Sequence, residues 1–117
     1  MTRLSEAETL ENLLPELQRL PLSSYDLARY LFSKLALANL SAQVWEIKLA
    51  DATRHHFALQ HHEAWLDCGA DNAAQATPMV LGADTVVEPL KLLEVAALSE
   101  AQLQFMCIQS AHFDHCY

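Results

Sequence analysis

The stretch SAQVWEIKLADATRHHFALQHHEAWLDC, residues 41–68, decides the fold. It predicts three antiparallel strands at residues 42–50, 55–60 and 64–68, because short runs of β-branched and aromatic residues are separated by turn-forming residues. With the turn at residues 62 and 63, residue i of the second strand pairs with residue 125 minus i of the third. A four-residue loop gives the same register, whereas a three-residue loop reverses the faces.

This register brings an imidazole and a carboxylate together. His56 and Asp67 become diagonal neighbours on one face, about 7–8 Å apart at Cα, while His55 and Cys68 lie on the other. A carboxylate fixes the tautomer of an imidazole and stabilises its protonated form. His56 and Asp67 are therefore candidate catalytic residues, with His55 and Cys68 as alternates. The structural alternative is a hydrogen-bonded polar pair on a half-exposed sheet face.

Two helical segments precede the strands. The sequence SEAE at residues 5–8 has the form of a capping box and predicts the start of the first helix. Pro15 predicts a kink or a division into two short helices. The second helix begins at Ser23 or Ser24 and ends near Asn39. Its apolar residues cover so much of its circumference that we expect it to pack on more than one side.

Shorter elements follow the three strands. Residues 79–81 and 85–87 are expected to form short strands, and Pro89 suits the first position of a helix. A second capping box at residues 99–102 predicts another helix. The order of elements predicts one α+β domain over residues 1–117, with N-terminal helices, a small antiparallel sheet of about three to five strands, and C-terminal helices.

Composition and net charge exclude some classes of function. The 117 residues carry a net charge of −8, and from His55 onwards eight acidic residues accompany one basic residue, Lys91. Phosphate-backbone binding needs clustered lysine and arginine, so a nucleic-acid ligand is not expected. No apolar stretch is long enough to span a membrane, and the first ten residues lack the pattern of a secretory signal. Three cysteines without paired spacing suit a reducing compartment, so we expect a cytoplasmic protein.

Several of these features together resemble a known family. SSYDLARYL at residues 23–31 forms a capped helix, a strand follows at residues 40–47, the next strand begins with histidine, and its hairpin partner contains WLD at residues 65–67. This arrangement, over residues 22–69, resembles the transglutaminase-like branch of papain-fold cysteine hydrolases. In that family a nucleophilic cysteine opens the helix, an alanine follows four residues later, and histidine and aspartate come from consecutive strands.

The resemblance can be carried over residue by residue. Ala28 matches the family's alanine, which places Ser24 at the position of the nucleophile, His56 or His55 at the histidine, and Asp67 at the aspartate. Serine departs from the family pattern, because a modest lowering of the pKa yields a thiolate but not an alkoxide. The resemblance therefore implies a degenerate member that has kept the fold for binding.

A metal site is a separate possibility. His112, His115 and Cys116, with Cys107 before them, offer imidazole and thiolate ligands of the kind that zinc prefers. Their spacing matches no closed structural zinc site. The alternative interpretation is therefore a protein without any cofactor. The histidine pairs at residues 55–56 and 61–62 each offer one ligand per face, because adjacent strand residues point to opposite faces.

The leading functional hypothesis is a small acidic cytosolic module that binds another protein, as an accessory, inhibitory or immunity-type domain. The first alternative is a hydrolase or acyl transferase that uses His56 and Asp67 with Ser24 or Cys68. The second alternative is a metal-binding protein that uses the histidines and cysteine near the C-terminus.

Overall fold

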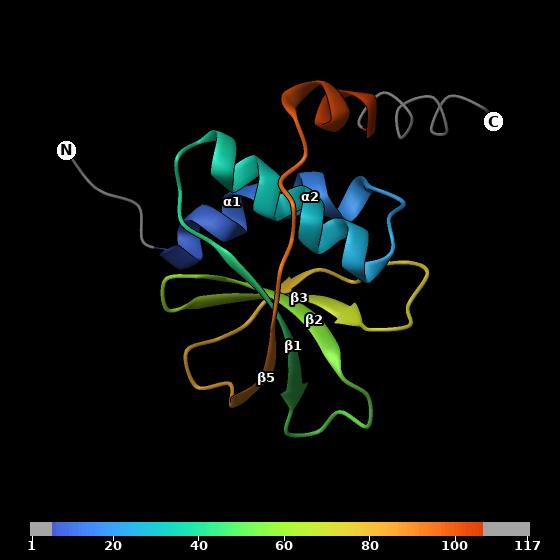
Figure 1. Cartoon of the computed structure of the whole chain (residues 1–117). Coiled ribbons are helices and arrows are strands. Elements are labelled where there is room, and N and C mark those ends of the chain that lie inside the picture. The colour runs from blue at the N-terminus through green and yellow to red at the C-terminus, as the bar shows by residue number, and fades with distance from the viewer. Residues whose placement is uncertain (1–5, 107–117) are drawn as a thin grey trace.

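In the computed structural model, which describes residues 6–106, two helices precede a five-stranded sheet (Figure 1). The elements are α1 (Glu6–Arg19), α2 (Ser24–Leu37), β1 (Gln43–Leu49), β2 (His56–His61), β3 (Ala64–Ala70), β4 (Met79–Val80) and β5 (Val87–Leu93). Residues 100–106 are again helical. The predicted α+β class is therefore confirmed, with helices before and after the sheet in sequence.

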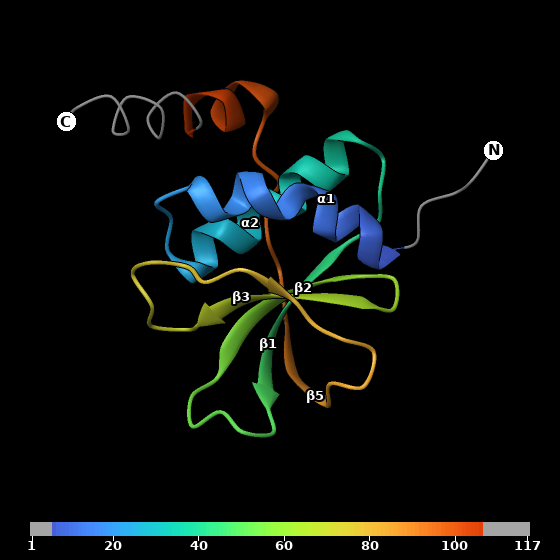
Figure 2. The same cartoon turned by 180° about the vertical axis from the view of Figure 1, so that it is seen from behind.

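The sheet is antiparallel and has the strand order β4-β3-β2-β1-β5. α1 and α2 lie on one side of it (Figures 1 and 2). The connection of residues 81–86 joins β4 and β5, which are the two edges, and runs on the side away from the helices. The sheet thus has a helix-covered face and a helix-free face.

The ends of α2 agree with the sequence. Ser23 is the N-cap residue, and its hydroxyl accepts a hydrogen bond from the backbone N–H of Asp26 at 3.2 Å. Asn39 follows the C-cap residue Ala38 and has a φ of 60°, in the left-handed region that commonly ends helices.

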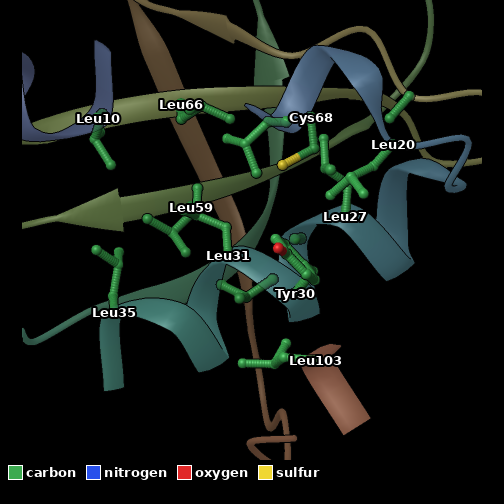
Figure 3. Close-up of a cluster of buried hydrophobic side chains, with 14 residues drawn as sticks. Leu10, Leu20, Leu27, Tyr30, Leu31, Leu35, Leu59, Leu66, Cys68 and Leu103 are labelled. Atoms are coloured by element: carbon green, nitrogen blue, oxygen red, sulfur yellow. The ribbon is translucent and has the colours of Figure 1, made fainter. Parts of the chain in front are cut away.

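The core lies between α2 and the helix-covered face (Figure 3). Its members come from α1, α2, the central strands and the last helix: Leu10, Leu27, Tyr30, Leu31, Leu35, Leu59, Leu66, Cys68 and Leu103. α2 therefore packs on several sides, as its apolar circumference predicts.

α1 continues without interruption through Pro15. Of the two predicted alternatives, the division into two short helices is therefore wrong and the kink stays a prediction, since a proline removes one amide donor and crowds the preceding turn. Leu10 and Leu17, on either side of the proline, are both buried in the core. This packing holds the two halves of the helix in place. The cap predicted at Ser5 lies outside the described residues.

The prediction of a helix that begins at Pro89 is also wrong. Residues 87–93 instead form β5, an edge strand beside β1, and the strand predicted at 85–87 begins only at its last residue. An edge strand tolerates proline because only one of its sides needs ladder hydrogen bonds. A bulge makes Leu90 the extra residue, and Leu93 pairs with Val44 next to the core. Pairing with a strand more than 40 residues earlier decides this structure.

The hairpin of β2 and β3 has the expected register near its turn. Leu59 pairs with Leu66, and the same register extends to the pair of Ala58 and Asp67. A bulge follows, because Phe57 pairs with Gly69 and leaves one β3 residue extra. Gly69 has a φ of 116°, which a residue without Cβ adopts readily. The bulge bends the strand at the position where the candidate site lies.

The two faces can be assigned along β2. The ring of Phe57 contacts the ring of Tyr25 on α2, with centroids 5.5 Å apart, and Leu59 lies in the core. Both residues therefore belong to the helix-covered face. Because strand residues alternate, His56, Ala58 and Gln60 belong to the helix-free face.

The segment after β5 crosses α2. Arg29 Nε donates a hydrogen bond to the carbonyl of Ala96 at 2.9 Å, and Leu98 N–H donates to Ser33 Oγ at 2.7 Å. The predicted capping box at residues 99–102 is confirmed, since the two end residues exchange side-chain-to-backbone hydrogen bonds. None of the helices within residues 6–106 combines the length and apolar character needed to cross a bilayer.

Candidate functional site

The centre of the candidate site is the pair of His56 and Asp67. His56 Nδ1 lies 2.9 and 3.0 Å from the two carboxylate oxygens of Asp67, and Asp67 Oδ1 also accepts a hydrogen bond from Gly69 N–H at 2.9 Å. The Asp67 side chain is 6% exposed and that of His56 20%. The carboxylate requires a proton on Nδ1, which leaves Nε2 free to transfer one. The expected proximity of the two side chains is therefore present.

Ser24 does not join the pair of His56 and Asp67. It is the first residue of α2, is buried, and its Oγ donates a hydrogen bond to the carbonyl of Ala70 at 2.6 Å. A Cβ placed on Gly69 would come within 3.7 Å of the Ser24 Cβ, so the helix meets β3 closely here. Within the described residues no hydrogen bond joins Ser24 to His56. The serine is on the helix-covered side and the imidazole belongs to the helix-free face.

The alternates have different surroundings. Cys68 is fully buried in the core, and burial, with a smaller contribution from the charge of Asp67, raises the pKa of its thiol well above the ordinary value. Such a thiol is a poor nucleophile at neutral pH. His55 precedes β2, is exposed, and its Nδ1 lies 3.7 Å from an Oε1 of Glu46. Neither alternate completes a nucleophile–histidine–aspartate chain.

Asp67 is part of a continuous row across the helix-free face, whereas His56 lies in a neighbouring row between Ala70 and Ile47. The strand registers place Met79, Asp67, Ala58, Trp45 and Leu92 side by side across all five strands. The two residues at the edges are exposed, Met79 by 54% and Leu92 by 47%. Apolar side chains therefore lie on both sides of the buried Asp67 in this row.

Two tryptophans meet on the same face. The rings of Trp45 and Trp65 lie 6.4 Å apart between centroids, reaching towards each other across β2. Trp45 Nε1 donates a hydrogen bond to Gln60 Oε1 at 2.9 Å. Ala58, the neighbour of Trp45 in the row, is fully buried although α1 and α2 lie on the opposite side of the sheet. The indoles thus form a fixed, half-buried surface.

Possible metal ligands fall into two groups. His112, His115 and Cys116, the ligands predicted for zinc, lie outside the described residues. Within residues 6–106 a different group of three donors comes together, from Glu46, His55 and Asp71. Sequence reasoning missed this group, because the expected register pairs residue 55 with residue 70, and only the bulge makes Asp71 the partner of His55.

Comparison of the chain with protein families, with curated proteins and with solved structures finds no match. The resemblance to transglutaminase-like hydrolases therefore remains a prediction.

Proposed function

We propose that this chain is a cytosolic protein-binding module, of an accessory, inhibitory or immunity type, whose contact surface is the helix-free face of the sheet. The observation that carries the proposal is the row from Met79 to Leu92, with its exposed apolar ends and the two tryptophans between them. Exposed apolar groups gathered around rigid aromatic side chains are typical of interaction sites.

The distribution of charge supports a protein partner. On β1, Trp45 faces the helix-free side, and the alternation places Glu46 and Lys48 on the other. Within the row the one carboxylate, Asp67, is buried, and depletion of exposed charge at the centre of a contact surface is characteristic of protein interfaces. The acidic surplus from His55 onwards disfavours nucleic acid as the ligand.

The state of the nucleophile position also supports binding rather than catalysis. The hydroxyl hydrogen of Ser24 is donated to Ala70, so it is not available to an imidazole base. In our proposal the chain keeps the scaffold of a transglutaminase-like domain but has lost the nucleophile. The polar pair of His56 and Asp67 then serves to orient the surface around it.

The experiment compares two sides of the molecule. A photo-crosslinking amino acid at Met79 or Leu92, introduced in the native host, should capture a partner that the same residue at Phe105 does not. Phe105 is a matched control because it is 58% exposed and lies in the helix after β5. The captured protein is then purified, and its affinity for M79E/L92E should fall at least tenfold, while that of F105E is unchanged. Equal affinities for both variants would refute the proposal.

A hydrolase or acyl transferase is the second candidate, favoured by the hydrogen bonds between His56 and Asp67. A fluorophosphonate probe, which reacts with activated serines, separates the two functions. The binding proposal expects no labelling of the native protein. Labelling that disappears in both S24A and H56A would establish an active serine and favour the enzyme.

A further inference from the structure

The structure brings three metal-ligand side chains together where β2 begins and β3 ends, beside the middle of β1. Glu46 lies on β1, His55 directly precedes β2, and Asp71 directly follows β3. One ligand atom of each lies within 4.8 Å of the ligand atoms of the other two. We propose that Glu46, His55 and Asp71 bind a divalent transition-metal ion such as Zn²⁺.

The backbone positions of the three residues are fixed by the sheet. Asp71 N–H donates a hydrogen bond to the carbonyl of His55 at 2.9 Å, which continues the pairing of β2 with β3. Glu46 pairs with Phe57, two residues from His55, so it is the diagonal neighbour of the histidine. All three residues share the helix-covered side of the sheet by alternation. Glu46 lies on a strand, and the backbone hydrogen bond holds His55 and Asp71 at the ends of theirs, so the backbone of the site is held more reproducibly than in a loop.

The charges of the group favour a cation. Neither carboxylate forms an ion pair with a lysine or arginine of the described residues, although Lys91 is the cross-strand neighbour of Glu46. Two carboxylates held near each other repel, and a divalent ion between them removes this repulsion. His55 supplies the nitrogen that distinguishes a transition-metal site from an all-oxygen calcium or magnesium site.

The coordination would be open. Three protein ligands leave at least one position of a tetrahedral zinc ion for water or an outside ligand. Zinc bonds of about 2.0–2.2 Å require the donors to approach more closely than they do here. His55 and Asp71 are exposed, so their side chains can rotate and bring the ligand atoms closer together. This site is separate from the helix-free face, so it does not depend on the proposed function.

The test uses the full chain with the C-terminal thiol and imidazole donors removed. Cys107, His112, His115 and Cys116 are changed to alanine, so that the C-terminal segment cannot supply ligands. Isothermal titration with ZnCl₂ should then show one equivalent of bound zinc. Replacing Zn²⁺ with Co²⁺ should give visible absorption that reports an imidazole and carboxylate environment.

Three variants decide the proposal. H55A and D71N should each weaken zinc binding at least about tenfold, the loss that removing even an outer-shell partner often causes. H62N is the matched control: His62 is exposed in the β2–β3 turn with a φ of 55°, a conformation that asparagine tolerates. It should bind zinc like the parent. An absence of heat in the parent, or equal affinities for H55A and H62N, would overturn the proposal.

Discussion

The hydroxyl of Ser24 and the carbonyl of Ala70 form a 2.6 Å hydrogen bond that ties the start of α2 to the end of β3. Ala70 pairs with His56, so the serine reaches the backbone beside the histidine without reaching its ring. Ser24 therefore has a structural role, at the position that the predicted resemblance matches to a nucleophile.

Ser24→Ala should lower the free energy of unfolding by about 1 kcal/mol, because it removes this hydrogen bond from a buried site. Urea denaturation measures the change. Ser41→Ala is the control and should have almost no effect. Ser41 is exposed, and it contacts His61 through its backbone carbonyl, which the substitution keeps. An unchanged stability of Ser24→Ala would contradict the structural role.

Asp67→Asn should destabilise the protein by about 1–3 kcal/mol. The buried carboxylate accepts hydrogen bonds from His56 and Gly69, and bonds to charged groups are stronger than neutral ones. The measurement is the urea midpoint at pH 7. Asp51→Asn makes the same chemical change at an exposed turn and should leave the midpoint nearly unchanged. Similar losses in the two variants would show that the His56 contact contributes nothing.

Glu16 should make the stability depend on pH in the acid range. Burial acts to raise its pKa, but hydrogen bonds from Lys34 and Tyr30, with the charge of Lys34, outweigh burial and hold the pKa below the ordinary value of 4.5. A lowered folded-state pKa stabilises the protein above pH 4.5, and this contribution is lost as the pH falls through the folded-state pKa. The difference in urea midpoint between wild type and Glu16→Gln should therefore shrink below pH 4.5. The exposed control Glu11→Gln should show no such trend.

Cys68 should react with thiol reagents only when the protein unfolds. With Cys107 and Cys116 changed to serine, labelling at pH 8 should proceed no faster than unfolding itself, because the thiol is fully buried. The raised folded-state pKa adds a second expectation. Only the unfolded chain forms thiolate, so stability should decline as the pH rises past about 9.0, the ordinary value. Rapid labelling of the native protein would disagree with this burial.

Pro89 and Lys91 should protect the free edge of β5. Proline removes a ladder donor, and charged side chains discourage pairing with another strand. The double variant Pro89→Thr, Lys91→Thr should therefore form dimers at high concentration. Light scattering after size-exclusion chromatography measures the mass. Glu94→Thr, just beyond the strand, should match the wild type. A double variant that stays at the wild-type mass would show that these residues do not guard the edge.

The hairpin of β2 and β3 is predictable because its register follows from a short turn and a local apolar pattern. Leu59 and Leu66 face each other in the core as that pattern requires. The bulge is harder to predict. Inserting one extra residue before Gly69 costs little free energy locally, and whether it forms depends on how α2 packs against β3. Helix caps, by contrast, are local hydrogen bonds, and those at Ser23 and Ser99 form as expected.

Two features depend on distant contacts and were therefore beyond reach. The sequence of β5 suits a helix as well as a strand, and its pairing with Val44 and Trp45 decides between them. The side of the sheet to which His56 belongs is set by Phe57, which contacts α2 through Tyr25. A one-residue shift would have turned the imidazole towards the helix, so the composition of the site was easier to predict than its geometry.

The strand order has a consequence for folding during synthesis. β5 is made last of the five strands but lies beside β1, which is made first. Until residue 93 leaves the ribosome, the edge of β1 that later pairs with β5 is open. Trp45 has no neighbouring strand at this edge during that time. A nascent chain of this protein should therefore be most prone to aggregate in the interval between completion of β3 and arrival of β5.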